Sequence, residues 1–122
     1  MELITAFEAI VGQKLTSVVF IWDYLQFKFE DPDITLTVYT KPHVKANRIS
    51  FSWHDFGVKD HLVDIIGKEL ISVEEQNDSF SFKFSNSSEL IITSAENDDV
   101  SPEALDFRSS DGWWVINRSN WS

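Results

Sequence analysis

The 122-residue chain contains 20 Asp and Glu residues against 10 Lys and Arg residues, which gives a formal net charge of -10. Such a charge repels phosphate backbones and anionic lipid headgroups, so direct binding to nucleic acid or to a membrane is not expected. The chain has no cysteine, which excludes disulfides, thiolate nucleophiles and zinc–thiolate sites. A hydrophobic content of 43% over this length predicts one folded domain, residues 1–122.

The N-terminal residues predict a short helix. Leu3, Phe7 and Ile10 recur at helical spacing, and Gly12 follows them as the residue best able to adopt the left-handed conformation that ends a helix. The segment lacks the basic region and the long apolar stretch of a secretory signal. We therefore expect a cytoplasmic protein.

Three strands are predicted after this helix, where the hydrophobic period changes to two. Leu25, Phe27 and Phe29 alternate with polar residues, so one face of the middle strand is expected to lie in the core. Asp23 marks the turn before that strand. The three strands are residues 15–20, 25–29 and 34–40, with an acidic turn at residues 30–33.

The segment between this meander and the next helix predicts a loop and one further strand. Residues 41–47 contain Pro42 and predict the loop. Residues 48–53 place Ile49, Phe51 and Trp53 on one face, as an extra strand would.

The same series of elements recurs later in the chain, at the constant offset that leads from Ile10 to Ile65. A second helix is predicted from the spacing of Val58, Leu62 and Ile65, with Asp55 as its N-cap and Gly67 at its end. We therefore predict an internal repeat, about residues 3–40 and 58–94, in which each copy is a helix followed by a three-stranded meander. The matched segments are 10–18 with 65–73, 23–29 with 78–84 and, after a one-residue slip, 34–37 with 90–93.

The C-terminal part predicts a helical turn and a hairpin. Residues 101–103 have the residue types that begin a helix. The hairpin is predicted over residues 105–117, with its turn at residues 111–112. Neighbours on a strand point to opposite faces, so one indole of Trp113 and Trp114 is expected in the core and the other outside.

The predicted fold class is α+β, mainly antiparallel β. A meander with one apolar face is not stable alone, because burial of that face is needed to offset the loss of chain entropy. We therefore expect the two repeated helix-plus-three-strand units to pack together. The expected result is a β-sandwich or flattened barrel with short flanking helices and an approximate twofold axis.

No catalytic residue, metal site or cofactor is predicted. His54, Asp60, His61 and Asp64 have metal-ligand residue types, but on a helix His61 points roughly 100° away from Asp60. We interpret these residues as part of a solvated surface. The chain has neither a Gly-x-Ser-x-Gly elbow nor a glycine-rich phosphate loop among its 4 glycines.

Two aromatic residues distinguish the first copy from the second. Trp22 and Tyr24 flank the first hairpin turn, whereas the second copy has Asn77 and Ser79 at the matched positions. Trp and Tyr are over-represented among the residues that dominate interface energy. The difference indicates that copy one has kept these side chains for a task that copy two does not perform.

Acidic residues gather in two loops. A solubilising surface is one explanation, and a docking face for a strongly basic protein is the other, because opposed potentials accelerate encounter. The candidate partner-binding residues are Glu30, Asp31, Asp33, Asp98, Asp99 and Glu103, with Trp22 or Tyr24 as an apolar anchor.

A family resemblance rests on several sequence patterns. These are Ile-Ile-Gly-Lys-Glu-Leu-Ile-Ser-Val at residues 65–73 with the Phe-x-Phe-x-Phe strand after it, Pro-Glu-Ala-Leu-x-Phe at 102–107, and Trp-Trp-Val at 113–115. Together they resemble small acidic bacterial proteins, some of which are immunity partners of polymorphic or contact-dependent growth-inhibition toxins. The resemblance implies an immunity role. It rests on structural residues, so it carries over no binding residue.

We therefore expect a non-enzymatic protein-binding module that neutralises a cognate basic toxin, such as a nuclease, by electrostatic occlusion. Two alternatives stay open. One is a small-molecule-binding or enzymatic domain with a pocket between the sheets. The other is a self-associating structural module whose edge strands pair across a dimer. Monomer and homodimer are both compatible with the sequence.

Overall fold

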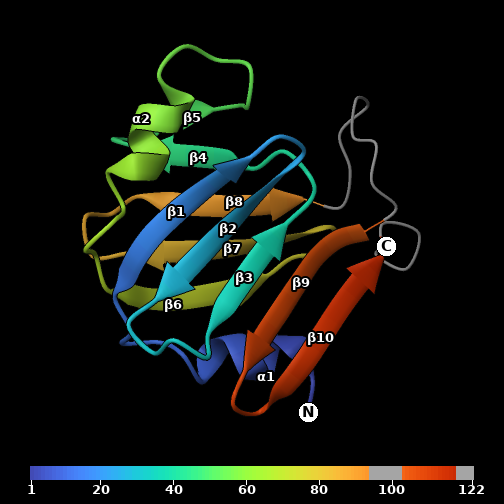
Figure 1. The fold of residues 1–122 in the computed structure, drawn as a ribbon. Coiled ribbons are helices and arrows are strands. Elements are labelled where there is room, and N and C mark those ends of the chain that lie inside the picture. Colours follow the sequence, from blue (N-terminus) through green and yellow to red (C-terminus); the bar gives the residue numbers. More distant parts are fainter. Residues whose placement is uncertain (94–102, 118–122) are drawn as a thin grey trace.

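The computed structural model of the chain describes residues 1–93 and 103–117, which form two five-stranded antiparallel sheets and two short helices (Figure 1). The sheets pack around one hydrophobic core. The expected α+β class, mainly antiparallel β with sandwich-like packing, is confirmed. The helices are α1 (Leu3–Glu8) and α2 (Val58–Val63). The strands are β1 (Leu15–Ile21), β2 (Tyr24–Phe29), β3 (Thr35–Val38), β4 (His43–Ala46), β5 (Ile49–Phe51), β6 (Leu70–Glu75), β7 (Ser79–Phe84), β8 (Glu89–Thr93), β9 (Glu103–Ser109) and β10 (Gly112–Asn117).

Each sheet combines a three-stranded meander with a hairpin that comes from elsewhere in the chain. The strand orders are β1-β2-β3-β9-β10 and β5-β4-β8-β7-β6. The β4–β5 hairpin follows β3 in sequence but pairs with β8, and the β9–β10 hairpin follows β8 but pairs with β3. The two hairpins are therefore exchanged between the sheets, which holds both halves of the chain in one core.

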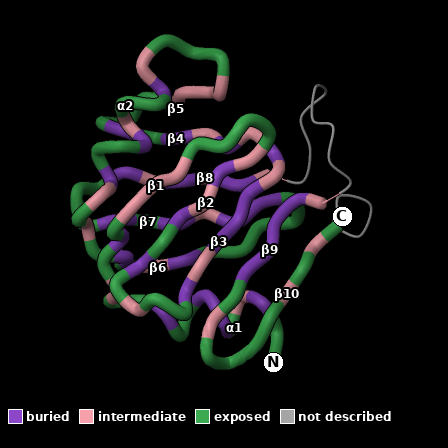
Figure 2. The backbone as a smooth tube through the Cα atoms, in the orientation of Figure 1, coloured by how far each residue is buried: buried purple, intermediate pink, exposed green. Residues whose placement is uncertain are grey.

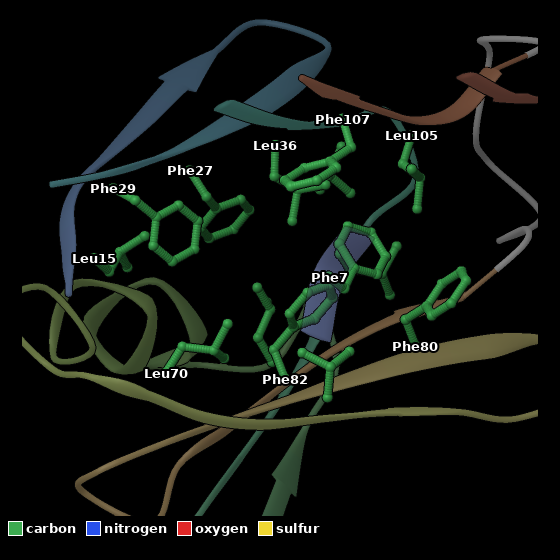
Figure 3. Packing of buried hydrophobic residues seen from close by; sticks show 14 of the residues in the cluster. Phe7, Leu15, Phe27, Phe29, Leu36, Leu70, Phe80, Phe82, Leu105 and Phe107 are labelled. Atoms are coloured by element: carbon green, nitrogen blue, oxygen red, sulfur yellow. The ribbon is translucent and has the colours of Figure 1, made fainter. Parts of the chain in front are cut away.

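The centre of the core is an aromatic cluster around α1. Phe7 is fully buried, and its ring contacts those of Phe80 and Phe82 from the second sheet and Phe107 from the first (Figure 3). The ring centroids are 4.8 to 5.1 Å apart and the rings meet edge to face. Such pairs add to the free energy of burial, so Phe7 joins the two sheets.

Burial alternates along β2 and β7 as predicted. In β2, Leu25, Phe27 and Phe29 are buried whereas Lys28 is exposed, and β7 likewise buries its phenylalanines and exposes its lysine. The strands β3 and β9 in the middle of the first sheet are largely buried, and β10 at its edge is largely exposed (Figure 2). Exposure of a residue therefore depends both on the face to which it points and on how close its strand lies to the edge of the sheet.

The two sheets are joined at one edge by a short reciprocal pairing of residues 12–15 with residues 67–70. Lys14 and Glu69 form an antiparallel bridge at its centre. Gly12 and Gly67 flank this bridge and have φ angles of +100° and +85°, which favour glycine. The hydrogen bonds are Gly12 N to Leu70 O (2.8 Å), Gly67 N to Leu15 O (2.7 Å), Leu15 N to Lys68 O (3.0 Å) and Leu70 N to Gln13 O (2.9 Å).

Two predictions about the middle of the chain are wrong. Residues 41–47 contain the strand β4 rather than a loop, because Val44 and Ala46 are buried in the core while the strand pairs with β8. Asp55 is not the N-cap of α2. Gly57 occupies that position, and the Asp55 carboxylate instead accepts a hydrogen bond of 2.7 Å from the Ser52 amide.

The predicted slip between the two meanders has the wrong direction. Leu36 pairs with Phe27, and Leu90 pairs with Phe82. Because Phe27 and Phe82 are matched, Leu36 corresponds to Leu90, whereas the prediction matched Ile34 with Leu90. The second meander is thus one residue shorter at the turn before its third strand.

The C-terminal hairpin differs from its prediction by one residue at the turn. Ser109 pairs with Gly112, so Ser110 and Asp111 form the turn and Gly112 begins β10. Glu103 is the first residue of β9 and not part of a helical turn. The other residues of that predicted turn, 101 and 102, lie outside the described residues.

Candidate functional site

A cavity of about 490 Å³ lies at the tip of the β1–β2 hairpin, beside the connection from β3 to β4 and the start of α2. We call it the tip cavity. Its volume falls within the usual range of sites for small molecules. The hairpin tip is at the same end of the molecule as β4, β5 and α2 (Figure 1). The residues that line the cavity are Phe20, Ile21, Trp22, Asp23, Tyr24, Leu25, Tyr39, Thr40, Lys41, Trp53 and Lys59.

Aromatic rings form much of the tip cavity. Tyr24 and Tyr39 lie side by side, with ring centroids 5.7 Å apart. Trp53 contributes a partly buried indole, and the ammonium group of Lys59 lies 5.4 Å from the centre of that ring. Trp22 stands at the hairpin turn and is 97% exposed. The cavity therefore offers flat apolar faces next to a solvent-facing indole.

Tyr39 links the tip cavity to two carboxylates. Burial, followed by the charges of Glu103 and Asp106, raises the pKa of the Tyr39 phenol above its ordinary value near 10. A hydrogen bond joins the Tyr39 and Glu103 side chains. The phenol is protonated at neutral pH, as an ordinary tyrosine is, and it donates its hydrogen bond to the Glu103 carboxylate.

The structure brings three of the predicted partner-binding residues into one region. Trp22 and Tyr24 line the tip cavity, and Glu103 joins them through its hydrogen bond to Tyr39. Glu103 therefore supplies negative charge next to the aromatic residues. Asp98 and Asp99, the other candidates from the same acidic segment, lie outside the described residues.

The acidic turn between β2 and β3 lies apart from this region. Glu30, Asp31 and Asp33 follow the end of β2, whereas Tyr24 begins it. The six residues of β2 span about 17 Å at ~3.4 Å per residue, so these carboxylates lie at the opposite end of the strand (Figure 1). They do not share one surface with the hairpin tip.

Two of the carboxylates in this turn have structural partners. Glu30 Oε1 accepts a hydrogen bond of 2.9 Å from the amide of Lys14, next to the pairing that joins the two sheets. Asp31 Oδ1 accepts one of 2.9 Å from the amide of Asp33, which forms an Asx turn. These contacts give Glu30 and Asp31 a structural role within the chain that does not require a protein partner.

The two tryptophans face opposite sides of β10, as predicted, but the inward one, Trp114, is only partly buried against the core. Trp114 packs on Phe107 with ring centroids 5.9 Å apart, and its indole N–H donates to the carbonyl of Met1 at 3.1 Å. Trp113 is 61% exposed, and the guanidinium group of Arg108 lies 4.5 Å from its ring centre. The outward indole is thus covered on one face by a cation of the neighbouring strand.

The histidines do not line the tip cavity. The ring of His61 lies against Phe51, with centroids 4.4 Å apart. In the described part of the chain, no group of three or more His, Asp or Glu side chains is arranged to hold a metal ion. None of the helices in residues 1–93 and 103–117 is long or apolar enough to cross a membrane.

Five lining residues come from outside the β1–β2 hairpin and were not predicted as site residues: Tyr39, Thr40, Lys41, Trp53 and Lys59. Tyr39 lies against Tyr24 because β3 pairs with β2, whereas Trp53 and Lys59 follow the exchanged β4–β5 hairpin. Of these residues, only Tyr39 could have been predicted from the sequence. It stands opposite Tyr24 on the next strand, where the two rings are in reach of each other. Comparisons of the chain with protein-family models, with curated proteins and with solved structures find no match.

Proposed function

We propose that this protein is a non-enzymatic binding module of the immunity type, which neutralises a basic protein toxin by docking through the tip of the β1–β2 hairpin. The observation that carries the proposal is Trp22, whose side chain is 97% exposed on the hairpin turn. Together with the exposed side chains of Phe20 and Ile21, its indole forms a contiguous apolar surface, and such surfaces mark interaction sites. Buried at the centre of an interface, such a side chain commonly dominates the binding energy.

The charge of the chain favours a basic partner. The net charge of -10 attracts a cationic protein from a distance and accelerates the encounter. Close to the anchor, Asp23 is exposed at the same turn and Glu103 lies beside Tyr39. We propose that these two carboxylates contact the partner while Trp22 is buried in it.

We further propose that the chain consists of two copies of one unit whose final hairpins are exchanged. The support is the repeated register. Val18 pairs with Phe27 in the first meander, and Val73 pairs with Phe82 in the second, so both residues of the pair are shifted along the sequence by the same number of positions. The exchanged hairpins repeat their register in the same way, with Lys45 opposite Ser50 in one and Arg108 opposite Trp113 in the other. Under this proposal the second hairpin tip is an internal control for the first.

The control residues are those of the β6–β7 tip. Asn77 occupies the position of Trp22, so a polar residue suffices to close the turn. The aromatic residue is therefore not a requirement of the fold. This favours an interaction role for Trp22 over a structural one.

The experiment is calorimetry of the purified chain against the protein encoded by the adjacent gene. We expect nanomolar binding that weakens as salt rises, because screening shortens the reach of charges to about 8 Å at physiological ionic strength. Trp22→Asn should weaken binding about 100-fold, which corresponds to ~2.7 kcal/mol. Asn77→Trp, the matched control in the other tip, should leave the affinity unchanged.

Glu103→Gln tests the electrostatic part of the proposal. The variant should slow association and reduce its dependence on salt, while the tryptophan anchor stays in place. Absence of binding to the neighbouring gene product, or a Trp22→Asn variant that binds like the parent chain, would contradict the proposed docking site.

A further inference from the structure

We infer that the outer edge of β1 pairs with the same edge of a second copy of this chain, which gives a dimer with twofold symmetry. The interface is formed by the backbone of β1 and the side chains beside it, whereas Trp22, the anchor of the proposed docking, lies beyond the last residue of the strand. The dimer therefore goes beyond the proposed function and forms without a toxin. Three observations support it: the open edge, the lack of charge along it and the difference from the matched edge strand of the other sheet.

β1 is an edge strand with one open side. It is the first strand of its sheet and pairs with β2 on its other side (Figure 1). The pairing with residues 67–70 covers its start and ends at Leu15. Among the described residues, no other segment is hydrogen-bonded to the open side of residues 17–21, which we call the free stretch. An edge strand presents unpaired N–H and C=O groups to which a further strand can pair.

The free stretch is apolar on both faces and has no charged residue. Val18 and Phe20 stand on its inner face, opposite buried residues of β2. Val19 and Ile21 stand on its outer face. The side chains of Phe20 and Ile21 are 43% and 38% exposed. A strand added to this edge would cover them through cross-strand contacts, to which pairs of aromatic and β-branched residues contribute.

The matched edge strand of the second sheet has charges where β1 has none. In β6, Glu74 stands at the position of Val19. Glu75 likewise stands at the position of Phe20, and both carboxylates are exposed. Charged side chains protect an edge strand, because a second copy would place like charges opposite each other. The fold thus permits such protection at these positions, and β1 lacks it.

A second copy fits this edge because the free stretch is complementary to itself. In an antiparallel pair with its twofold axis at Val19, Val18 of one chain lies opposite Phe20 of the other. The same contact recurs on the other side of the axis. Every contact is therefore made twice, and the assembly closes at two chains.

Charge favours the antiparallel orientation. A parallel pair would place the two exposed Asp23 side chains next to each other, whereas an antiparallel pair brings each Asp23 to the start of β1 in the other chain. Charges of both signs stand there: Lys14, Lys28, Lys68, Glu30, Asp31 and Glu69. The local charges therefore do not oppose this pair. The net charge of -10 on each chain opposes association at longer range, and salt screens that repulsion.

The test is analytical ultracentrifugation of the full chain over a range of concentrations. We expect a reversible change from the mass of one chain to that of two, and tighter association as salt rises. This salt dependence is opposite to that of docking to a basic protein. A single chain up to millimolar concentration, or association that weakens with salt, would overturn the inference. So would a series of larger species, which pairing of β1 with the opposite edge strand, β10, would give.

Variants at Val19 locate the interface. Val19→Glu and Val19→Lys should each raise the dissociation constant of the dimer at least about tenfold, because like charges then face each other across the axis. An equimolar mixture of the two variants should restore a dimer with one chain of each kind. Glu74 at the matched position of β6 shows that the fold accepts a carboxylate there.

Ile71→Glu is the matched control. Ile71 is exposed on β6, the protected edge strand, so the same change of charge there should leave the dissociation constant of the dimer unchanged. The melting temperature of each variant shows whether its fold is retained. Val19→Glu that dimerises like the parent chain, a mixture that stays monomeric, or loss of the dimer in Ile71→Glu at an unchanged melting temperature would each contradict the interface.

Discussion

The β1–β2 and β6–β7 hairpins have the same strand pairing but different side chains at their tips. Both have an irregular register at the same place, between Leu15 and Ser17 in one and between Leu70 and Ser72 in the other. Their inward residues are alike, since both second strands bury three apolar side chains. Their tips are not alike: one has Phe-Ile-Trp at residues 20–22 and the other has Glu-Gln-Asn at residues 75–77.

The comparison separates the demands of folding from those of binding. Residues that face the core are constrained by packing, because interiors have the density of organic crystals and tolerate few changes of volume. Residues at the tips meet no such constraint. The exposed aromatic side chains of Phe20 and Trp22 in one tip, with no counterpart in the other, are therefore not a requirement of packing, and this difference supports the proposed interaction.

The largest effect on stability is expected at Phe7. Both Phe7 of α1 and Leu62 of α2 are fully buried, but Phe7 also contacts three phenylalanine rings from both sheets. Phe7→Ala should lower the free energy of unfolding by about 4 kcal/mol, and Leu62→Ala by about 3 kcal/mol. Urea unfolding followed by tryptophan fluorescence measures both. A smaller loss of unfolding free energy in Phe7→Ala than in Leu62→Ala would contradict the central role of Phe7 in the core.

The paired glycines test the equivalence of the two halves at the junction between the sheets. Gly12→Ala and Gly67→Ala should each cost about 1 kcal/mol, because both φ angles are positive and an L side chain is strained there. An added Cβ meets no atom within 4 Å at either site, so the cost is conformational. The two losses, measured by urea unfolding, should agree within about 0.5 kcal/mol. A clearly unequal pair would show that the two turns are not equivalent.

The local elements could be predicted from the sequence because the spacing of apolar residues indicates which face of a strand is buried. Phe27 and Phe82 were placed in the core on that basis, and both are buried. The strand β4 was missed because it contains His43 and Lys45 and follows Pro42, so its identity depends on pairing with β8. Local patterns do not contain such long-range pairing.

The candidate site could be predicted only in part for the same reason. Trp22 and Tyr24 were found because the internal match exposes the difference between the tips. Trp53 and Lys59 reach the same cavity through the exchange of hairpins between sheets, which no local pattern encodes. Charge clustering in sequence was a weaker guide, since Glu30 and Asp31 are engaged within their own turn or with the amide of Lys14.

The smallest effect is the pH dependence contributed by Tyr39. The chain has 2 tyrosines, so Tyr24→Phe leaves the Tyr39 phenol as the one tyrosine whose ultraviolet absorbance titrates. Its midpoint should lie above 10, because burial and the carboxylates of Glu103 and Asp106 raise its pKa. In the same background, Glu103→Gln should lower that midpoint only part of the way, since burial is the larger cause and remains.

The raised pKa of Tyr39 also fixes the sign of its effect on stability. Above pH 10 the unfolded chain loses the phenolic proton while the folded chain keeps it, so the stabilisation is complete below the unfolded value and is lost as pH rises through it and the folded pKa. Tyr39→Phe should therefore reduce the fall in unfolding free energy above pH 10. The other half has no counterpart to this effect, because Thr93 stands at the matched position and carries no titratable group. An unchanged alkaline slope in Tyr39→Phe would show that neither burial nor the carboxylates of Glu103 and Asp106 raise the pKa of this phenol in the folded chain.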